Sequence, residues 1–349
     1  MELYKSTLEQ ITDLNRETMQ AAWDRIDSLA TPTRALGQLN NIAAQLAGIM
    51  GTPTPKIHKK CVIIMGGDHG IVDEGVSAYP QEITVAMMMV FTKGGAGINC
   101  LSNHVGSDVI VVDIGVKGDT SVFPGVIQRK IRPGTANMAI GPAMTREEAI
   151  AAIEVGIEMA NQQIDAGYDL LATGDMGIGN TTPSSTLLAA FTGLSPAEVA
   201  GRGTGVDDEG LKKKINAIAK ALEVNKPNPN DPVDVLSKVG GLEIAGLTGV
   251  ILGAAAKKRP VIIDGFISSA AALVAAKISP LSVKYMIGSH CSAEQAHHIM
   301  LETIGLMPVL NLEMRLGEGT GAALTMPIVE AATKILTDMF TFQDLGVPC

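Results

Sequence analysis

The sequence predicts an α/β fold in which a mostly parallel, six-stranded sheet is covered by helices. Two observations predict this fold. Short runs rich in β-branched residues recur along the chain, and each is followed by a stretch with helical spacing. Buried strands that alternate with helices form a parallel sheet with both faces covered.

The six predicted strands are short apolar runs that are bounded by turn-forming residues. Several of the intervening helices begin with a capping signal, as in Thr145-x-x-Glu148, Ser195-x-x-Glu198 and Ser292-x-x-Gln295. These signals support the alternation of strands and helices independently of hydrophobicity. The strands are expected at residues 61–65, 109–113, 169–173, 261–264, 283–287 and 307–310.

The two ends of the chain differ from its middle. Residues 5–50 and 325–345 show helical spacing without a convincing strand. We therefore expect a small helical domain made of residues 1–50 plus 325–349, beside a large domain made of residues 51–324. The turn-rich segment at residues 225–231 is expected to be a surface excursion within the large domain.

Composition narrows the classes of function. The chain has 349 residues, of which 46% are hydrophobic and 18% are charged, so it is long enough for about two domains of ~150 residues. The net charge is −9, and the longest basic run is Lys212 to Lys214. A nucleic-acid partner is therefore not expected.

The cysteines and the apolar runs bear on location. Cys61, Cys100, Cys291 and Cys349 lack the Cys-x-x-Cys spacing of a zinc site, and we interpret them as reduced thiols in a cytoplasmic protein. The N-terminal residues show no signal-peptide pattern, and the apolar run at residues 244–256 is too short to cross a bilayer. Neither export nor membrane insertion is expected.

A glycine-rich segment follows the third predicted strand. Its residues 174–182 read Gly-Asp-Met-Gly-Ile-Gly-Asn-Thr-Thr, and a helix is predicted to start there. Backbone N–H groups at a helix N-terminus bind phosphate well, so phosphate binding is the favoured interpretation. The alternative is a turn whose glycines serve packing alone. The spacing matches neither the GxGxxG fingerprint nor a P-loop.

Three further polar residues are candidates for a site. Lys214 belongs to a basic triplet that is typical of a solvated helix face, and it becomes a ligand only if the fold returns it to the glycine-rich segment. Ser292 is predicted to be a helix N-cap, a position that also suits a phosphate. Glu318 lies between glycines, so it either points into a cleft as a base or is an exposed loop residue.

A metal site is not expected. The first predicted strand is followed by Gly66-Gly67-Asp68-His69-Gly70, and Asp68 with His69 lacks the further histidine that a catalytic zinc site needs. The favoured interpretation is a tight turn in which Asp68 accepts hydrogen bonds from nearby backbone amides.

Four motifs, taken together, resemble those of the nicotinate-nucleotide:5,6-dimethylbenzimidazole phosphoribosyltransferases of cobamide biosynthesis. They occur in the family's order over almost the whole chain, at residues 67–76, 174–182, 264–266 and 317–321. The resemblance implies a Rossmann-like large domain, a small helical domain from both chain ends, and a dimer in which the partner subunit approaches the active site. That dimer is a homodimer or a heterodimer with a homologous subunit.

The implied reaction moves the 5-phosphoribosyl group of nicotinate mononucleotide to an aromatic lower-ligand base and needs no cofactor. The resemblance makes Glu318 the catalytic base. It places Gly177, Gly179 and Asn180 beside the phosphate. Asp175, Lys214 and Ser292 are implied as further nucleotide-binding residues.

The same resemblance marks three departures from the family pattern. Asp175 stands where relatives commonly have glutamate, and the pocket for the acceptor base has Tyr79 and Met87 where they have serine and glutamine. An apolar Met87 suits phenol-like acceptors such as phenol or p-cresol, or else it packs against the methyl groups of dimethylbenzimidazole. We expect the latter, and keep the phenolic acceptor as the alternative.

Two rival functions fit the sequence less well. A Rossmann-type, nucleotide-dependent oxidoreductase would need GxGxxG after the first strand, which residues 66–70 do not supply. A catalytically silent subunit of a heterodimer is disfavoured by the presence of Glu318 and of the glycine-rich segment.

Overall fold

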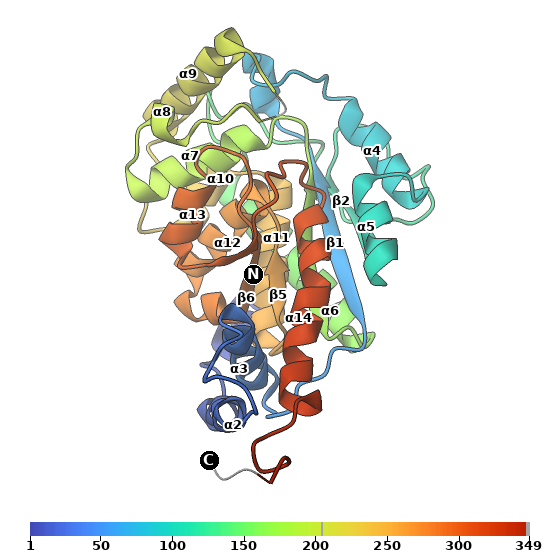
Figure 1. Ribbon diagram of the computed structural model, residues 1–349. Helices are drawn as coiled ribbons and strands as arrows, with labels where there is room; N and C mark the ends of the chain where they lie inside the picture. The colour runs from blue at the N-terminus through green and yellow to red at the C-terminus, as the bar shows by residue number, and fades with distance from the viewer. Residues whose placement is uncertain (204, 347–349) are drawn as a thin grey trace.

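The computed structural model of the chain describes residues 1–203 and 205–346, and its centre is a twisted parallel sheet (Figure 1). Within these residues the sheet has seven strands in the order β3-β2-β1-β4-β5-β6-β7, and every neighbouring pair is parallel. The strands are β1 (Lys60–Gly67), β2 (Asp108–Gly115), β3 (Val126–Gln128), β4 (Leu170–Met176), β5 (Val261–Ile263), β6 (Met286–His290) and β7 (Pro308–Leu310). The predicted α/β class and parallel sheet are confirmed.

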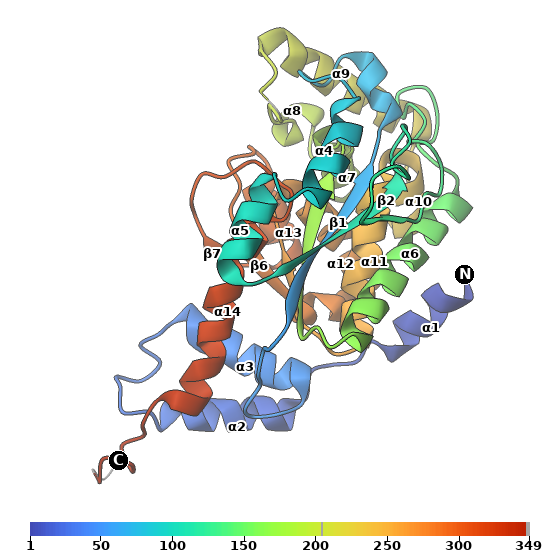
Figure 2. The ribbon, with the colours of Figure 1, turned by 90° about the vertical axis from the view of Figure 1, so that its right-hand side faces the viewer.

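Helices cover both faces of this sheet (Figures 1 and 2). The α-helices are α1 (Glu2–Gln10), α2 (Arg16–Asp27), α3 (Gln38–Met50), α4 (Ile83–Thr92), α5 (Gly97–Val105), α6 (Arg146–Asp165), α7 (Thr181–Thr192), α8 (Pro196–Val199), α9 (Asp208–Asn225), α10 (Pro232–Val239), α11 (Leu242–Ala256), α12 (Phe266–Ile278), α13 (His297–Ile304) and α14 (Thr320–Asp338). Two 3₁₀ helices add η1 (Gly70–Glu74) and η2 (Pro280–Tyr285).

Two details of the predicted sheet are wrong. Strand β3 is absent from the prediction, because three residues at the sheet edge are too short to give a periodic pattern. The strand predicted at residues 283–287 begins three residues later, since Val283 to Tyr285 belong to η2 and the pairing with β5 starts at Met286. His290 is therefore the last residue of β6 rather than part of the loop beyond it.

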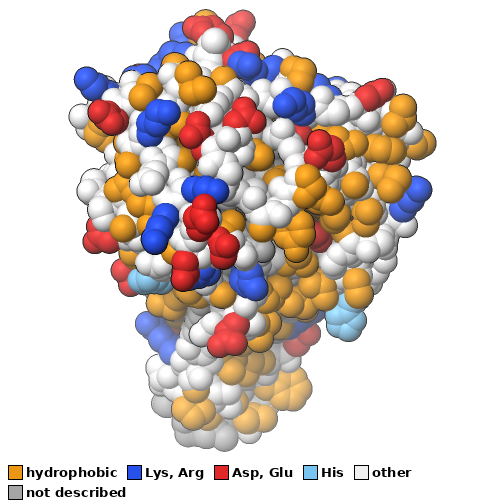
Figure 3. Space-filling model, turned by 90° about the horizontal axis from the view of Figure 1, so that it is seen from above, with side chains coloured by type: hydrophobic (Ala, Val, Ile, Leu, Met, Phe, Trp, Pro, Cys, Tyr) orange, Lys and Arg blue, Asp and Glu red, His pale blue; other side chains and the backbone are white. Residues whose placement is uncertain are grey.

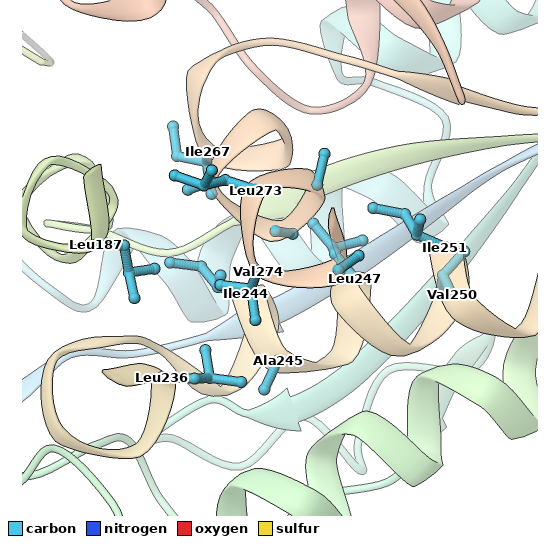
Figure 4. Close-up of a cluster of buried hydrophobic side chains, with 14 of the residues drawn as sticks. Leu187, Leu236, Ile244, Ala245, Leu247, Val250, Ile251, Ile267, Leu273 and Val274 are labelled. Atoms are coloured by element: carbon cyan, nitrogen blue, oxygen red, sulfur yellow. The ribbon is translucent and has the colours of Figure 1, made fainter. Parts of the chain in front are cut away.

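One core lies between the sheet and helices α6, α10, α11 and α12 (Figure 4). Helix α11 packs so closely on α6 that the two backbones touch: a Cβ on Gly249 would lie 1.9 Å from the carbonyl oxygen of Ile153. A Cβ on Gly156 would lie 1.8 Å from the carbonyl oxygen of Gly246. Glycine at these positions permits the close packing of α6 and α11 beneath the sheet.

The chain ends meet on the opposite face. Helices α2 and α3 pack against each other and against α14, while α1 lies apart from them and contacts α6 and α11 (Figure 2). The first turns of α14 also touch β4, β5 and β6. The division into a helical domain of residues 1–50 plus 325–349 and a large domain of residues 51–324 stays a prediction.

One stretch has the composition of a membrane span. Residues 83–105 have a mean hydropathy of 1.2 over an 18-residue window, and 33% of that window is buried. In the fold this stretch is two helices, α4 and α5, joined by a turn that contains Gly94 and Gly95. Neither helix alone is long enough for the roughly 20 residues that a bilayer requires.

Candidate active site

A cavity opens at the carboxyl ends of β4, β5, β6 and β7, where ligands bind in open parallel sheets. Its volume is about 640 Å³. The polar lining comprises Asp175, Asn180, Thr181, His290, Ser292, Glu294, Arg315 and Glu318. The apolar lining comprises Tyr79, Ile83, Met87, Met176, Ile178, Phe266, Ile267 and Leu316. Residues from five separate segments of the chain therefore meet in one pocket.

The glycine-rich segment leads into α7, as predicted. Asn180 is the N-cap of that helix, and the amides of Ile178, Asn180 and Thr182 already donate hydrogen bonds within the protein. Among the described residues, the amides of Gly177, Gly179 and Thr181 have no protein acceptor. Free amides at a helix N-terminus are suited to an anion.

Gly177 and Gly179 are glycines for reasons that the sequence alone did not give. A Cβ on Gly177 would point toward the sheet and lie 2.2 Å from the carbonyl oxygen of Gly67 in β1. Gly179 has φ +89°, and a Cβ there would lie 2.8 Å from Val72. Both glycines let the segment lie flat against β1 and η1.

Asp175 is buried at the end of β4, and Asn180 Nδ2 donates to its Oδ2 at 2.9 Å. Its other oxygen, Oδ1, has no protein partner among the described residues. Burial, reinforced by the charge of Asp264, raises the pKa of Asp175 to about 8. The side chain is therefore mostly protonated at neutral pH and offers a hydrogen-bond donor at the pocket wall.

Lys214 does return to the glycine-rich segment. It is completely buried, and its Nζ donates to Thr181 Oγ1 at 2.7 Å and to the carbonyl oxygen of Gly201 at 3.0 Å. Burial lowers the pKa of Lys214 to about 8, opposed by the charge of Glu294. The fold places it behind the pocket wall rather than on a solvated helix face.

Ser292 lines the pocket, but it is not a helix N-cap. Helix α13 starts at His297 with Ala296 as its N-cap, so the capping box predicted at Ser292 is wrong. The Ser292 hydroxyl instead accepts a hydrogen bond from the amide of Glu294 in a tight turn, and its own amide donates to His297 Nδ1 at 2.7 Å. The box at Thr145 is complete, whereas at Ser195 the amide and the hydroxyl both donate to Glu198 and the hydroxyl accepts nothing from the helix.

Glu318 points into the protein rather than to solvent. Only 7% of the residue is exposed, and its Oε2 accepts a hydrogen bond from the amide of Ile98 at the start of α5, at 3.0 Å. Burial raises the pKa of Glu318, and the negative charge of Asp264 adds to this effect, while the Ile98 amide opposes it. A buried carboxylate with raised proton affinity is suited to act as a base.

The predicted acceptor pocket is apolar. Ile83 and Met87 lie one turn apart on α4, and Tyr79 precedes that helix with 53% of its surface exposed. Met176, at the end of β4, lines the same cavity. The Tyr79 side of this pocket is open to the molecular surface.

Sequence reasoning did not propose Asp264, His290, Glu294 or Arg315 as site residues, although all but Asp264 line the pocket. His290 and Asp264 sit at or just after the ends of β6 and β5, the position that marks ligand-binding residues in this type of sheet. Their position at the strand ends could therefore have identified both residues from the sequence. Glu294 and Arg315 lie in loops without any local pattern.

The residues around Asp68 and His69 form a buried polar cluster, not a ligand set. His69 Nε2 lies 2.8 Å from Glu243 Oε1, and the amide of Lys117 donates to Asp68 Oδ2. Among the described residues, no group of three or more His, Cys, Asp or Glu side chains has the arrangement of a metal site.

Comparison with known proteins identifies the family. The profile of a family described as "Phosphoribosyltransferase" matches residues 11–347. The chain belongs to this family. It is 52% identical to the nicotinate-nucleotide–dimethylbenzimidazole phosphoribosyltransferase of Desulforamulus reducens and 51% identical to that of Geobacter sulfurreducens, with 99% of each chain aligned.

The fold agrees with the solved structures of this phosphoribosyltransferase family. The crystal structure of CobT from Thermus thermophilus matches with a TM-score of 0.91 and 46% identity, covering 95% of this chain and 99% of the other. The resemblance inferred from the four motifs is therefore confirmed, and the alternative of a Rossmann-type oxidoreductase is wrong.

Proposed function

We propose that this phosphoribosyltransferase moves the 5-phosphoribosyl group of nicotinate mononucleotide to an aromatic base, giving nicotinate and an α-riboside 5′-phosphate for cobamide biosynthesis. The observation that carries the proposal is the juxtaposition, in one pocket, of free helix N-terminal amides and a buried carboxylate. The first is suited to a phosphate and the second to a proton acceptor. The names of the relatives support the same substrates.

The donor nucleotide is proposed to place its 5′-phosphate on the amides of Gly177, Gly179 and Thr181. Asn180 and Ser292 supply further polar groups on the pocket wall. Lys214 fixes Thr181 from behind and adds positive charge below the phosphate. A dianionic phosphate favours the charged form of this buried lysine, so binding and protonation support each other.

Glu318 is proposed to be the catalytic base. The nicotinate ring leaves as a neutral pyridine, since its nitrogen is a cationic pyridinium in the donor, and no acid is needed there. The acceptor's N–H or O–H loses its proton to Glu318 as the ring nitrogen of an azole, or the oxygen of a phenol, bonds to C1′ of the ribose and the C1′–N bond to nicotinate breaks. Attack from the face opposite the leaving group converts a β-riboside to an α-riboside. No cofactor takes part in this step.

Dimethylbenzimidazole or a related base is the first candidate acceptor, because the relatives carry that name. A phenolic acceptor is the second candidate, and a specific observation favours it. Ile83, Met87 and Met176 line the acceptor side, and none of them offers a strong hydrogen bond to the second ring nitrogen of a benzimidazole.

The test is incubation with nicotinate mononucleotide and a panel of acceptors, with nicotinate release as the readout. Release that depends on an aromatic acceptor supports the proposed function, and no release with any acceptor contradicts it. Comparing dimethylbenzimidazole, phenol and p-cresol in the wild type and in Met87→Gln identifies the acceptor. If phenols are inert with the wild type while dimethylbenzimidazole reacts well, the phenolic alternative fails.

A dimer is proposed as the working form. Hydrophobic side chains gather on the right-hand side of Figure 3, over the side where α4 and α5 lie in Figure 1. Exposed apolar residues that line the pocket include Tyr79, Ile83 and Leu316. Helix α4 is apolar on every side and yet partly exposed, which favours coverage by a second copy or by a homologous subunit.

A cytoplasmic location is proposed because the described cysteines are not paired in disulfides. Cys61, Cys100 and Cys291 are free thiols, as expected in a reducing compartment, while Cys349 lies outside the described residues.

A further inference from the structure

The loop that carries Glu318 has an unusual backbone conformation. Gly317, Glu318 and Gly319 have φ values of +79°, +63° and +90°, three left-handed residues in succession. A non-glycine residue is strained in this conformation, which persists only where the surroundings fix it. Gly319 is pressed on the sheet, since a Cβ there would lie 2.4 Å from Val62.

Asp264 is the side chain that fixes this loop to the sheet. It follows β5 directly and is completely buried. Its Oδ2 accepts a hydrogen bond from the amide of Gly319 at 3.1 Å, and its Oδ1 accepts one from the amide of Ala322 at 2.9 Å. The carboxylate therefore caps α14 from a neighbouring element and holds the residue next to Glu318.

The backbone of Asp264 is itself tied to the strands on either side. Its amide donates to Thr173 Oγ1 in β4 at 3.2 Å, and its carbonyl oxygen accepts from Ser289 Oγ in β6 at 3.0 Å. Asp264 thus connects the Glu318 loop to three strands, β4, β5 and β6. A rigid link of this kind is what a catalytic group needs to keep its place during turnover.

The charges around Glu318 come from four elements. Asp175 at the end of β4 and Asp264 after β5 are acidic, and His290 at the end of β6 has its Nδ1 4.0 Å from Asp264 Oδ1. The amides of Gly97 and Ile98 in α5 face the carboxylate from the other side. Burial raises the pKa of Asp264, whereas His290 and the amides of α14 favour its charged form.

We propose that Asp264 is a positioning residue of the transfer reaction, which anchors the Glu318 loop to the sheet. The inference rests on the proposed role of Glu318 as the base. A catalytic group has to stay within about 0.5 Å of its productive position, and the two amides that donate to Asp264 hold the loop in place.

The test compares Asp264→Asn and Asp264→Ser with the wild type and with Asp113→Asn. Asp113 is a matched control, because it is also buried, near the end of a strand, and accepts hydrogen bonds from Val116 and Thr120, but it lies outside the pocket. Nicotinate release gives kcat, the KM for each substrate and the dependence of kcat on pH. Thermal melting reports folding.

We expect kcat to fall about 10–100-fold in both Asp264 variants, the cost of a misplacement near 1 Å, with the KM for nicotinate mononucleotide within about threefold. The acid limb of the kcat profile should move to lower pH by roughly one unit, because removing the charge lowers the pKa of Glu318. The control should keep the wild-type profile.

A wild-type kcat and pH profile in the folded Asp264 variants would overturn the inference, as would an equal loss in Asp113→Asn. Failure of both Asp264 variants to fold, while Asp113→Asn folds, would also overturn it and make Asp264 a folding element only. Glu318→Gln in the same assay separates the two ideas. If that variant turns over normally, the proposed base is wrong; if it is inactive and the Asp264 variants are normal, only the positioning role is wrong.

Discussion

At the scale of single residues, the candidate site contains two carboxyl groups that are held away from water. Glu318 and Asp175 line one cavity, and burial raises the pKa of each. They differ in what holds them: an amide of α5 faces Glu318, whereas Asn180 faces Asp175. Glu318 is thereby suited to take up a proton and Asp175 to donate a hydrogen bond.

Replacement of Glu318 by glutamine should leave nucleotide binding intact and lower turnover by about 10²–10⁴, the usual range for a lost general base. Glutamine keeps the size of the side chain but does not accept the acceptor's proton. Nicotinate release measures turnover, and calorimetry measures binding. Glu313→Gln is the control, since Glu313 is exposed in the same loop and does not line the pocket. Near-normal turnover in Glu318→Gln would reject the assignment.

Asp175→Asn should change how stability depends on pH. The raised pKa of about 8 means that the folded protein keeps a proton on Asp175 that the unfolded chain releases near pH 4. This group's contribution to the free energy of unfolding is therefore full below about pH 4 and falls as pH rises toward 8.

The Asp175→Asn variant has no carboxyl group at this position and so does not lose stability in this way as the pH rises. Its melting temperature should therefore rise relative to that of the wild type as the pH increases from 5 to 8. Thermal melts at several pH values check this. A constant difference across that range would show that Asp175 is ionised in the folded protein.

At the scale of elements, the junction from β4 to α7 is the proposed binding site for the phosphate. Its glycines allow close contact with β1 and η1, and the helix N-terminus supplies free amides. This junction was readily predicted from the sequence, because Gly-x-x-Gly-x-Gly before a helix is a local pattern. Its partners were not, since Lys214 comes from a helix that starts 27 residues later, and no local pattern shows that its Nζ reaches Thr181.

Gly179→Ala should weaken nicotinate mononucleotide binding by about tenfold or more, because the added Cβ meets Val72 and displaces amides from the phosphate. Gly193→Ala is a matched control at the other end of α7. Gly193 also has a positive φ, +76°, but no atom lies within 4 Å of its added Cβ.

Both variants bear the conformational cost of a left-handed alanine, roughly 1–2 kcal/mol, so stability should fall in both. Only Gly179→Ala should alter the nucleotide's dissociation constant while leaving the acceptor's KM within about twofold. Equal effects of the two variants on nucleotide binding would instead trace the loss to general destabilisation of α7.

Prediction from sequence worked for features that depend on neighbouring residues in the chain. It failed for features that depend on contacts between distant segments. The strands and the glycine-rich segment have local patterns, whereas the spacing left Glu318 open between a cleft and an exposed loop, and its role as the base stays a proposal. Strand β3 and the start of β6 depend on pairing with a neighbour, so Val283 looked like a strand residue and belongs to η2. Asp264 was part of a motif, but its link to Gly319 joins residues 55 apart in sequence.

At the scale of the whole molecule, the open pocket and the apolar surface beside it lead to the prediction of a dimer. A purified wild-type chain should have about twice the monomer mass of 36.3 kDa by sedimentation or light scattering. Ala86→Arg, on the exposed side of α4, should shift it toward the monomer, because a buried unpaired charge is costly.

Val224→Arg is the control, since Val224 is 46% exposed on α9, away from α4. A monomeric wild type that recovers the doubled mass only with a homologous chain would establish the heterodimer. A monomeric wild type that turns over at full rate by itself would contradict both forms of dimer.

The place of α14 in the chain has a consequence for synthesis on the ribosome. This last helix lies on β4, β5 and β6, and its first turn supplies the amides that satisfy Asp264. Until residues 318–322 leave the exit tunnel, the carboxylate of Asp264 lacks two of its amide donors and the pocket lacks Glu318. All strands of the sheet precede α14 in the chain, so the pocket is completed only after the last helix has been synthesised.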